Sequence, residues 1–310
     1  MEKLYYIYLE TSAVNYLLDN FTADELAVIK RLLKEQKNAC FCISSTTISE
    51  ILYTSEELRR EKLIFSLQNM CHEYLINTPE ELIIKYIESG MPEVEKKYDF
   101  YSSQTLANVW KDLYNNQAKT FIYDFQEFNE RKKASEKIFK EMIQDLSAEN
   151  SYLRASIDDA IKMDPEYETF NEEQLKIKQM CWLLIFLILC CGISIDNSCI
   201  EDYWNKLRIS SMPERVLYSM YNLQDLTNIG PIVIMAIMWS NQLENSNRGT
   251  LMDMFHSVYI VYCDSFLSND NHFRELKLYC EHVNFKKINI ISENTFFTGL
   301  RNAFDSYVPS

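Results

Sequence analysis

The chain has 310 residues, 47% of them apolar, which is enough for a buried core and excludes wholesale disorder. Its net charge of -14 argues against an extended basic groove for duplex nucleic acid. Its five glycines stand apart from one another, so the sequence contains neither a glycine-rich phosphate-binding loop nor a dinucleotide-binding fingerprint. With only six prolines as well, the composition favours a helix-rich chain.

The cysteines and one apolar segment bear on where the protein resides. Nine cysteines are present without a Cys-x-x-Cys pair, which predicts buried reduced thiols in the cytoplasm. A strand pattern follows Met1-Glu2-Lys3 directly, so we expect no signal peptide. The apolar residues 180–195 fall short of the roughly 20 that a membrane-spanning helix needs. We therefore expect a central buried helix there and no membrane association.

Short apolar runs alternate with helical patterns over residues 1–90. Thr22 and Glu25 form a capping box, and Pro79 stands at a favoured first helical position. Such alternation predicts a parallel sheet covered on both faces. The expected strands are residues 4–9, 39–44 and 74–76, and the expected helices begin near Ala13, at Thr22 (through Lys34), at Thr47 and at Pro79.

The sequence pattern between residues 90 and 247 differs from that of residues 1–90. Long polar and aromatic helical patterns fill this stretch, together with the two most apolar segments, and no strand alternation is seen. The predicted fold class is therefore α/β, a parallel sheet flanked by helices, with a large all-helical insertion or second domain. The α/β domain is expected to be discontinuous, formed by residues 1–89 and 248–310, and the helical insertion to cover 90–247.

The alternation of strand and helix patterns returns after Asn247. We therefore expect the C-terminal third of the α/β domain to complete it. The elements expected there are a helix from about Thr250 to Tyr262, a strand at 265–267, a helix from Asn271 to Tyr279 and a strand at 287–292.

Four acidic residues fall where these elements meet one edge of the sheet. Glu10 follows the first strand, and Asp270 follows the strand at 265–267. Glu50 and Asp253 each lie in the expected first turn of a helix. Because the helices of a parallel α/β sheet begin at the edge where the strands end, all four carboxylates should converge. Four acids so close would repel one another without a cation, and oxygen-only sets suit Mg²⁺ or Mn²⁺.

Each acid also has a local structural interpretation. Glu50 and Asp253 stand where a capping box places its acid, and Asp270 is expected to cap the helix that follows it. Acids in a first helical turn also complement the helix dipole. Glu10 differs, because it caps no obvious helix unless its two neighbours share the task.

Four further residues near these acids in the sequence are candidates for supporting roles. Thr11 and Ser12 carry hydroxyls that could orient a carboxylate or a phosphate, or could only satisfy the backbone turn. Asp264 is expected to be structural, at the end of a helix before a strand, with a place on the acidic rim as the alternative. His256 shares a helix face with Asp253, and packing is its favoured role.

Three stretches resemble the PIN domain family of metal-dependent nucleases: YLETS (8–12), ISEIL (48–52) and DMFHSVYIVYCDSFLSNDNHF (253–273). That family has an acid before Thr-Ser or Thr-Asn after strand one, and a glutamate in the helix after strand two. An aspartate then opens a later helix, and a last aspartate lies in a Thr/Ser-x-Asp-x-x-Phe loop, which residues 268–273 match. The first acid of the family is more often Asp, and the resemblance does not extend to residues 90–247.

The resemblance implies that Glu10, Glu50, Asp253 and Asp270 bind one or two Mg²⁺ or Mn²⁺ ions and are the catalytic residues. It implies a metal-dependent endoribonuclease that hydrolyses phosphodiester bonds of RNA, with DNA as the second substrate class, and a toxin or defence role. The alternatives are a non-catalytic PIN-like module that binds protein or RNA, and a nucleotide phosphohydrolase. A protein partner for the helical insertion, still unidentified, and a homo-oligomer both stay open.

Overall fold

A computed structural model gives the fold. The chain divides into two compact units, of which the first comprises residues 1–78, 96–125 and 259–310 and the second 79–95 and 126–258. The structure describes residues 4–52, 54, 56–71, 74–90, 100–101, 103–114, 134, 137–138, 140–142, 144–145, 148, 151–194, 197–223, 230–242, 250–282, 289–292 and 295–299.

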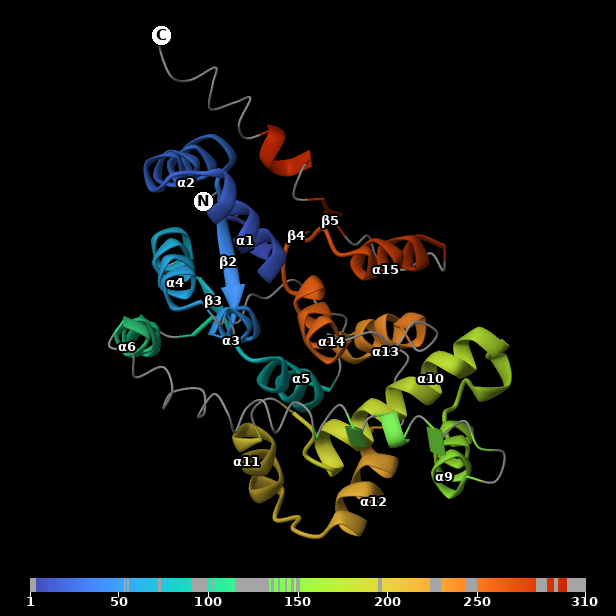
Figure 1. The fold of residues 1–310 in the computed structure, drawn as a ribbon. Helices are drawn as coiled ribbons and strands as arrows, with labels where there is room; N and C mark the ends of the chain where they lie inside the picture. The colour runs from blue at the N-terminus through green and yellow to red at the C-terminus, as the bar shows by residue number, and fades with distance from the viewer. Residues whose placement is uncertain are drawn as a thin grey trace. The chain divides into compact units, whose positions relative to one another are not determined.

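The first unit is built on a five-stranded sheet with the strand order β3-β2-β1-β4-β5, and every strand pairing is parallel (Figure 1). The predicted α/β class and parallel sheet are thereby confirmed. The elements of this unit are β1 (Tyr5–Leu9), α1 (Thr11–Asn20), α2 (Ala23–Lys37), β2 (Ala39–Ser44), α3 (Ser45–Leu52), α4 (Glu57–Cys71), β3 (Leu75–Ile76), α6 (Ser103–Tyr114), η3 (Tyr259–Val261), β4 (Ser265–Leu267), α15 (Asn271–His282) and β5 (Ile290–Ile291).

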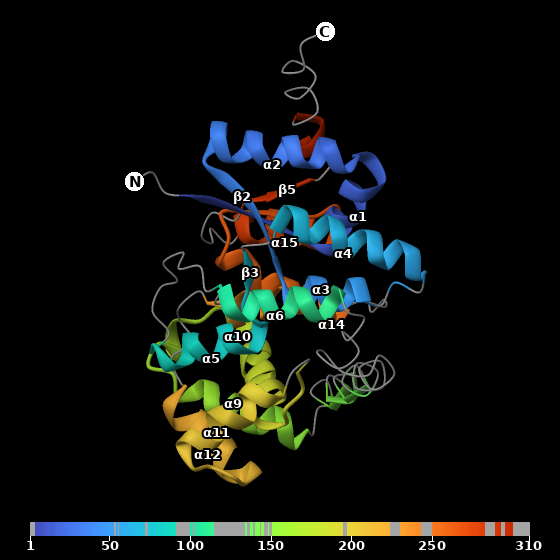
Figure 2. The same ribbon diagram turned by 90° about the vertical axis from the view of Figure 1, so that its left-hand side faces the viewer.

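One face of this sheet carries the main core of the unit. Successive strand side chains point to opposite faces, so Ile7 and Leu9 of β1 and Phe41 of β2 lie on the same side. They pack against apolar residues of α1, α2, α4 and α6, including the fully buried Leu17. Helices α2, α4 and α6 lie side by side on the face that Figure 2 turns towards the viewer.

The opposite face of the sheet holds a column of aromatic rings. Tyr8 stacks on Tyr259 at a centroid distance of 4.9 Å and on Phe266 at 5.0 Å. Phe273 of α15 packs on Phe266 at 4.7 Å. All four side chains are buried. Tyr8 of β1 therefore attaches the sheet to η3, and Phe266 of β4 attaches it to α15.

Two helices begin earlier than the sequence pattern predicts. Helix α1 begins at Thr11 rather than near Ala13, because Glu10 caps it. Helix α3 begins at Ser45 rather than at Thr47, which moves Glu50 into the second turn and removes its expected capping-box role. The capping box of Thr22 and Glu25 at the start of α2 is confirmed.

Every described element of the second unit is helical. The apolar segment predicted to be a central helix is buried and continues from α10 into a π-helical turn, η2. No described helix is long and apolar enough to cross a membrane. The elements are α5 (Pro79–Glu88), α9 (Tyr152–Lys162), η1 (Tyr167–Thr169), α10 (Glu172–Ile185), η2 (Phe186–Cys190), α11 (Ser198–Leu207), α12 (Met212–Asn222), α13 (Pro231–Gln242) and α14 (Thr250–Val258).

The bounds of the two units differ from the predicted domain bounds. Helices α5 and α14 belong to the second unit because both pack against α13, whereas α6 joins the core of the first. The insertion of residues 90–247 stays a prediction.

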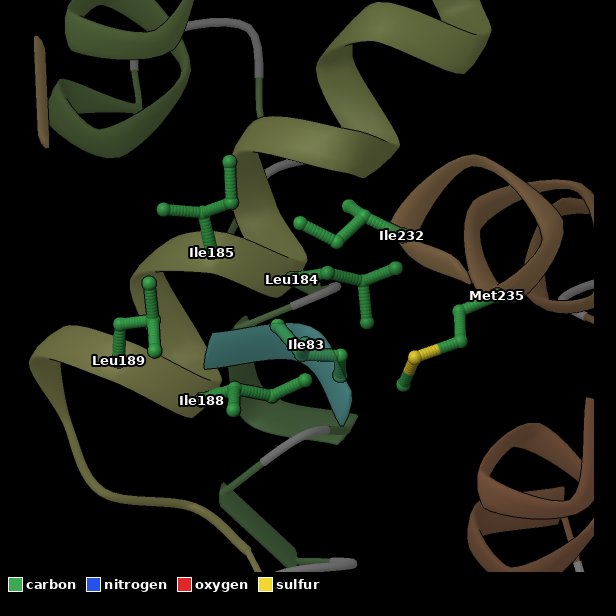
Figure 3. A pocket seen from close by; sticks show the side chains of 7 residues that line it. All are labelled: Ile83, Leu184, Ile185, Ile188, Leu189, Ile232 and Met235. Carbon is green, nitrogen blue, oxygen red and sulfur yellow. The ribbon is translucent and has the colours of Figure 1, made fainter. Parts of the chain in front are cut away.

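A small apolar pocket lies within the second unit (Figure 3). Ile83 of α5 faces residues of α10, η2 and α13 there, and every lining side chain is aliphatic or methionine. The pocket offers no ligand for a metal ion or a phosphate and forms part of the core. Its lining residues are Ile83, Leu184, Ile185, Ile188, Leu189, Ile232 and Met235.

Candidate functional site

Glu10 lies at the carboxyl end of β1, and its carboxylate accepts hydrogen bonds from Ser12 and Ser268. Its Oε2 accepts one from the backbone nitrogen of Ser12 at 3.1 Å, one from the Ser12 hydroxyl, and one from the Ser268 hydroxyl at 3.2 Å. The side chain is the N-cap of α1, and only 8% of the residue is exposed. Glu10 is thus a buried carboxylate that joins the end of β1 to the end of β4.

Glu50 projects from α3 towards the same edge of the sheet. Its Oε2 accepts a hydrogen bond from the hydroxyl of Thr11, the first residue of α1. Oxygens of Glu10 and Glu50 lie within 4.8 Å of each other. Two carboxylates from segments 40 positions apart therefore meet where β1 ends.

Asp270 lies in the loop after β4 and caps α15. Its side chain accepts a hydrogen bond from the backbone nitrogen of His272 at 2.8 Å, and the His272 ring nitrogen Nδ1 lies 3.4 Å from the same oxygen. The backbone nitrogen of Asp270 donates to the Ser268 hydroxyl oxygen at 3.0 Å. Ser268 thereby links Asp270 to Glu10 at the carboxyl edge of the sheet.

Asp253, the fourth predicted carboxylate, belongs to the second unit. It lies in the first turn of α14, as the sequence predicts, and is partly buried. His256 stands three residues further along the same helix and is fully buried. Its expected role in packing agrees with that burial. The convergence of Asp253 with the other three acids stays a prediction.

Asp264 stands at the opposite edge of the sheet from the acidic cluster. It precedes β4, whereas Asp270 follows that strand, and its Oδ2 accepts a hydrogen bond from the backbone nitrogen of Tyr6 at 2.9 Å. The alternative of a place on the acidic rim is therefore wrong, because the carboxylate is used to join β4 to the start of β1. The structural role that the sequence favours agrees with this contact.

A network of hydroxyl groups joins the ends of β1 and β2 to α3, the helix that carries Glu50. Tyr8 OH is 2.7 Å from Ser44 Oγ and 3.2 Å from Thr47 Oγ1, and Thr47 donates to the carbonyl oxygen of Leu9 at 3.2 Å. Burial raises the pKa of the Tyr8 phenol well above its ordinary value, with Tyr259 adding to the effect. Tyr8 therefore stays a neutral hydroxyl.

No family model, curated protein or solved structure matches this chain. Its function must therefore be inferred from the chemistry of the site itself.

Some of the described acidic and histidine side chains, Glu10 and Glu50 among them, are grouped closely enough to hold a metal ion. Glu10 and Glu50 offer oxygen ligands, and hard divalent cations such as Mg²⁺ and Mn²⁺ prefer oxygen. Two carboxylates whose oxygens lie within 4.8 Å repel each other when both are charged, and a cation between them removes that cost. The donor set therefore fits a hard divalent cation.

Ser268 and Thr47 contact the site, although the sequence did not single them out as site residues. Ser268 occupies the first position of the Thr/Ser-x-Asp loop, so its place in that motif was the available signal. Thr47 carried no such signal, because its bond to Leu9 crosses 38 positions. Thr11 and Ser12 each contact a carboxylate, which was one of their two expected roles.

Proposed function

We propose that the protein is a metal-dependent phosphodiester hydrolase of the PIN type, acting as an endoribonuclease. The observation that carries the proposal is the approach of Glu10 and Glu50 oxygens to within 4.8 Å at the carboxyl edge of a parallel sheet. Ligands of open α/β sheets bind at this edge. The acid-Thr-Ser sequence at the end of β1 and the Ser-x-Asp loop after β4 agree with that family.

The residues of the chain have separate roles in this proposal. Glu10 and Glu50 hold a Mg²⁺ or Mn²⁺ ion, with Asp270 beside them and Asp253 as the fourth ligand. When bound, the ion supplies a water of lowered pKa and neutralises charge that develops on the phosphate. Ser12 and Ser268 orient the Glu10 carboxylate, and Thr11 orients that of Glu50.

RNA is the proposed substrate, with DNA as the second candidate. The net charge of -14 disfavours long-range attraction of an extended duplex. Binding would then depend on contact between the cation and one phosphate, which a short accessible strand provides more readily.

Cleavage assays test the proposal. The wild-type chain should cleave single-stranded RNA only with Mg²⁺ or Mn²⁺, and Glu10→Gln and Glu50→Gln should each abolish cleavage. Asp253→Asn tests the fourth ligand and should lower activity as strongly. Glu35→Gln, at an exposed position of α2, is the matched control and should leave the rate unchanged. Cleavage that survives both glutamate substitutions would sink the proposal.

The capping bonds of Glu10 and Asp270 favour a second candidate, a non-catalytic binding module. In that case the acids stabilise helix starts rather than hold a cation. Calorimetry separates the two. Retained RNA binding without Mn²⁺ binding or cleavage would support the module, and Mn²⁺ binding lost in Glu50→Gln would support the hydrolase.

A further inference from the structure

Helix α3 is tied to the end of β1 by two hydroxyl bonds at different depths. In the outer, partly buried bond, Thr11 donates to Glu50. Beneath it, Thr47 donates from Oγ1 to the carbonyl oxygen of Leu9, and Thr47 is fully buried. The Leu9 carbonyl belongs to the peptide unit that carries the backbone nitrogen of Glu10. The inner bond therefore acts on the backbone of one glutamate from the helix that carries the other.

Hydrogen-bond direction in the inner network is fixed by its last acceptor. A carbonyl oxygen only accepts, so the single hydroxyl proton of Thr47 is committed to Leu9. Thr47 Oγ1 must then accept from its neighbours, Tyr8 OH at 3.2 Å or Ser44 Oγ at 3.4 Å. Tyr8 and Ser44 share the remaining contact at 2.7 Å. The three hydroxyls thus form one chain that ends on the Leu9 carbonyl.

Thr47 also lies on the face of α3 that carries the acid. It stands three residues before Glu50, and side chains at this spacing are neighbours on a helix surface. A rotation or a shift of α3 relative to β1 would break the bond from Thr47 to Leu9. The same movement would carry Glu50 away from Glu10. Tyr8 is anchored independently, because its ring is stacked between Tyr259 and Phe266.

We propose that the Tyr8, Ser44 and Thr47 hydroxyls are positioning groups that set the separation of the Glu10 and Glu50 carboxylates. The part of this inference that concerns cation affinity rests on the proposed function. Its geometric part does not, since it concerns only how two side chains are held. None of the three residues contacts the substrate or the cation.

Adjacent threonines give a matched pair of variants. Thr47→Val keeps the side-chain shape and removes the hydroxyl, whereas Thr47→Ser restores it. Thr46→Val is the control, because Thr46 is equally buried but pairs with Tyr259 OH at 3.3 Å and not with Leu9. Removing groups that orient ligands typically lowers metal affinity about 10–100-fold. We expect this loss of Mn²⁺ affinity in Thr47→Val, recovery in Thr47→Ser and wild-type affinity in Thr46→Val.

Hydrogen exchange of the Ser12 amide supplies a readout without metal. This amide donates to Glu10 Oε2 at 3.1 Å, so it reports how firmly that carboxylate is held. Exchange should be faster in Thr47→Val than in Thr46→Val. If Thr47→Val does not fold, Tyr8→Phe carries the same test, because it keeps the ring stack and removes one hydroxyl of the network.

The outcomes separate this inference from the proposed function. Equal Mn²⁺ affinity and equal Ser12 exchange in Thr47→Val and Thr46→Val, or in Tyr8→Phe and wild type, would overturn the positioning role. Absence of Mn²⁺ binding and of cleavage in the wild type would overturn the proposed function. Ser12 exchange would still decide the positioning role in that case.

Discussion

Ser268 donates a hydrogen bond from its hydroxyl to Oε2 of Glu10 at 3.2 Å, although 258 positions separate the two residues. The same hydroxyl oxygen accepts from the backbone nitrogen of Asp270 at 3.0 Å. One small side chain therefore ties together the ends of β1 and β4, the neighbouring strands at the centre of the sheet.

Ser268→Ala should weaken the binding of Mn²⁺. The variant removes one bond to the Glu10 carboxylate and the acceptor of the Asp270 amide, so Mn²⁺ affinity should fall about 10–100-fold. Ser265→Ala is the control, since Ser265 lies at the other end of β4 and contacts Tyr5 OH at 2.6 Å. Calorimetric titration with Mn²⁺ measures the affinity of both variants. Equal affinity in the two variants would contradict the role of Ser268.

Glu10→Asp should be impaired, even though aspartate is the more usual first acid of the family that the chain resembles. Shortening the side chain by one methylene draws the carboxylate back by about 1.5 Å. The bond from Ser268, 3.2 Å long with glutamate, would then be lost. We expect a fall of about 10–100-fold in cation affinity, against complete loss in Glu10→Gln. Wild-type Mn²⁺ affinity of Glu10→Asp in calorimetric titration would show that the extra methylene does not matter.

The buried ion pair of the second unit gives a prediction about stability alone. Lys178 Nζ lies 2.9 Å from Asp164 Oδ2, and their side chains are 9% and 2% exposed. Lys178→Met leaves a buried carboxylate without its cation and should cost about 3–5 kcal/mol in urea unfolding. Adding Asp164→Asn should recover most of this loss, because the asparagine oxygen still accepts the Glu166 amide. A double variant as unstable as the single one would be the opposing result.

Alkaline pH should destabilise the fold through buried thiols. Burial raises the pKa of Cys190 and Cys191 to about 11, and that of Cys181 to about 12. An unfolded thiol has a pKa of about 8.5, so above that pH the unfolded chain loses protons that the folded chain keeps. The free energy of unfolding should therefore fall from about pH 8.5 to 11.

Urea unfolding at pH 7.5 and pH 10 measures this effect. The double variant Cys190→Ala, Cys191→Ala removes two of the raised thiols and should depend less on pH. An equal pH dependence in wild type and double variant would show that other groups cause the loss.

The sequence predicts the sheet well because strand and helix patterns alternate on a short length scale. The run from Ala39 to Ser44 is bounded as predicted, and the capping box of Thr22 fixes the start of α2. The starts of α1 and α3 are not fixed by the sequence pattern. Glu10 and the serine and threonine residues before Glu50 can each serve as strand end, cap or first helical residue, and packing decides among them.

The sequence predicts that the site residues lie at one edge of the sheet, but it does not predict their individual contacts. The carboxyl ends of β1 and β4 are neighbours because of the strand order, which local patterns do not specify. The bond from Thr11 to Glu50 and the bond from Ser268 to Glu10 depend on that order and on rotamers. The motif contains the acids and their hydroxyl neighbours, whereas the pairing of Thr11 with Glu50 and of Ser268 with Glu10 follows from tertiary packing.

Anomalous diffraction from crystals grown with Mn²⁺ shows directly whether Glu10 and Glu50 share a cation. We expect an Mn²⁺ peak coordinated by carboxylate oxygens of both Glu10 and Glu50, which disappears in Glu50→Gln crystals. Mn²⁺ bound only at other positions, or no peak beside this pair at saturating Mn²⁺, would contradict it.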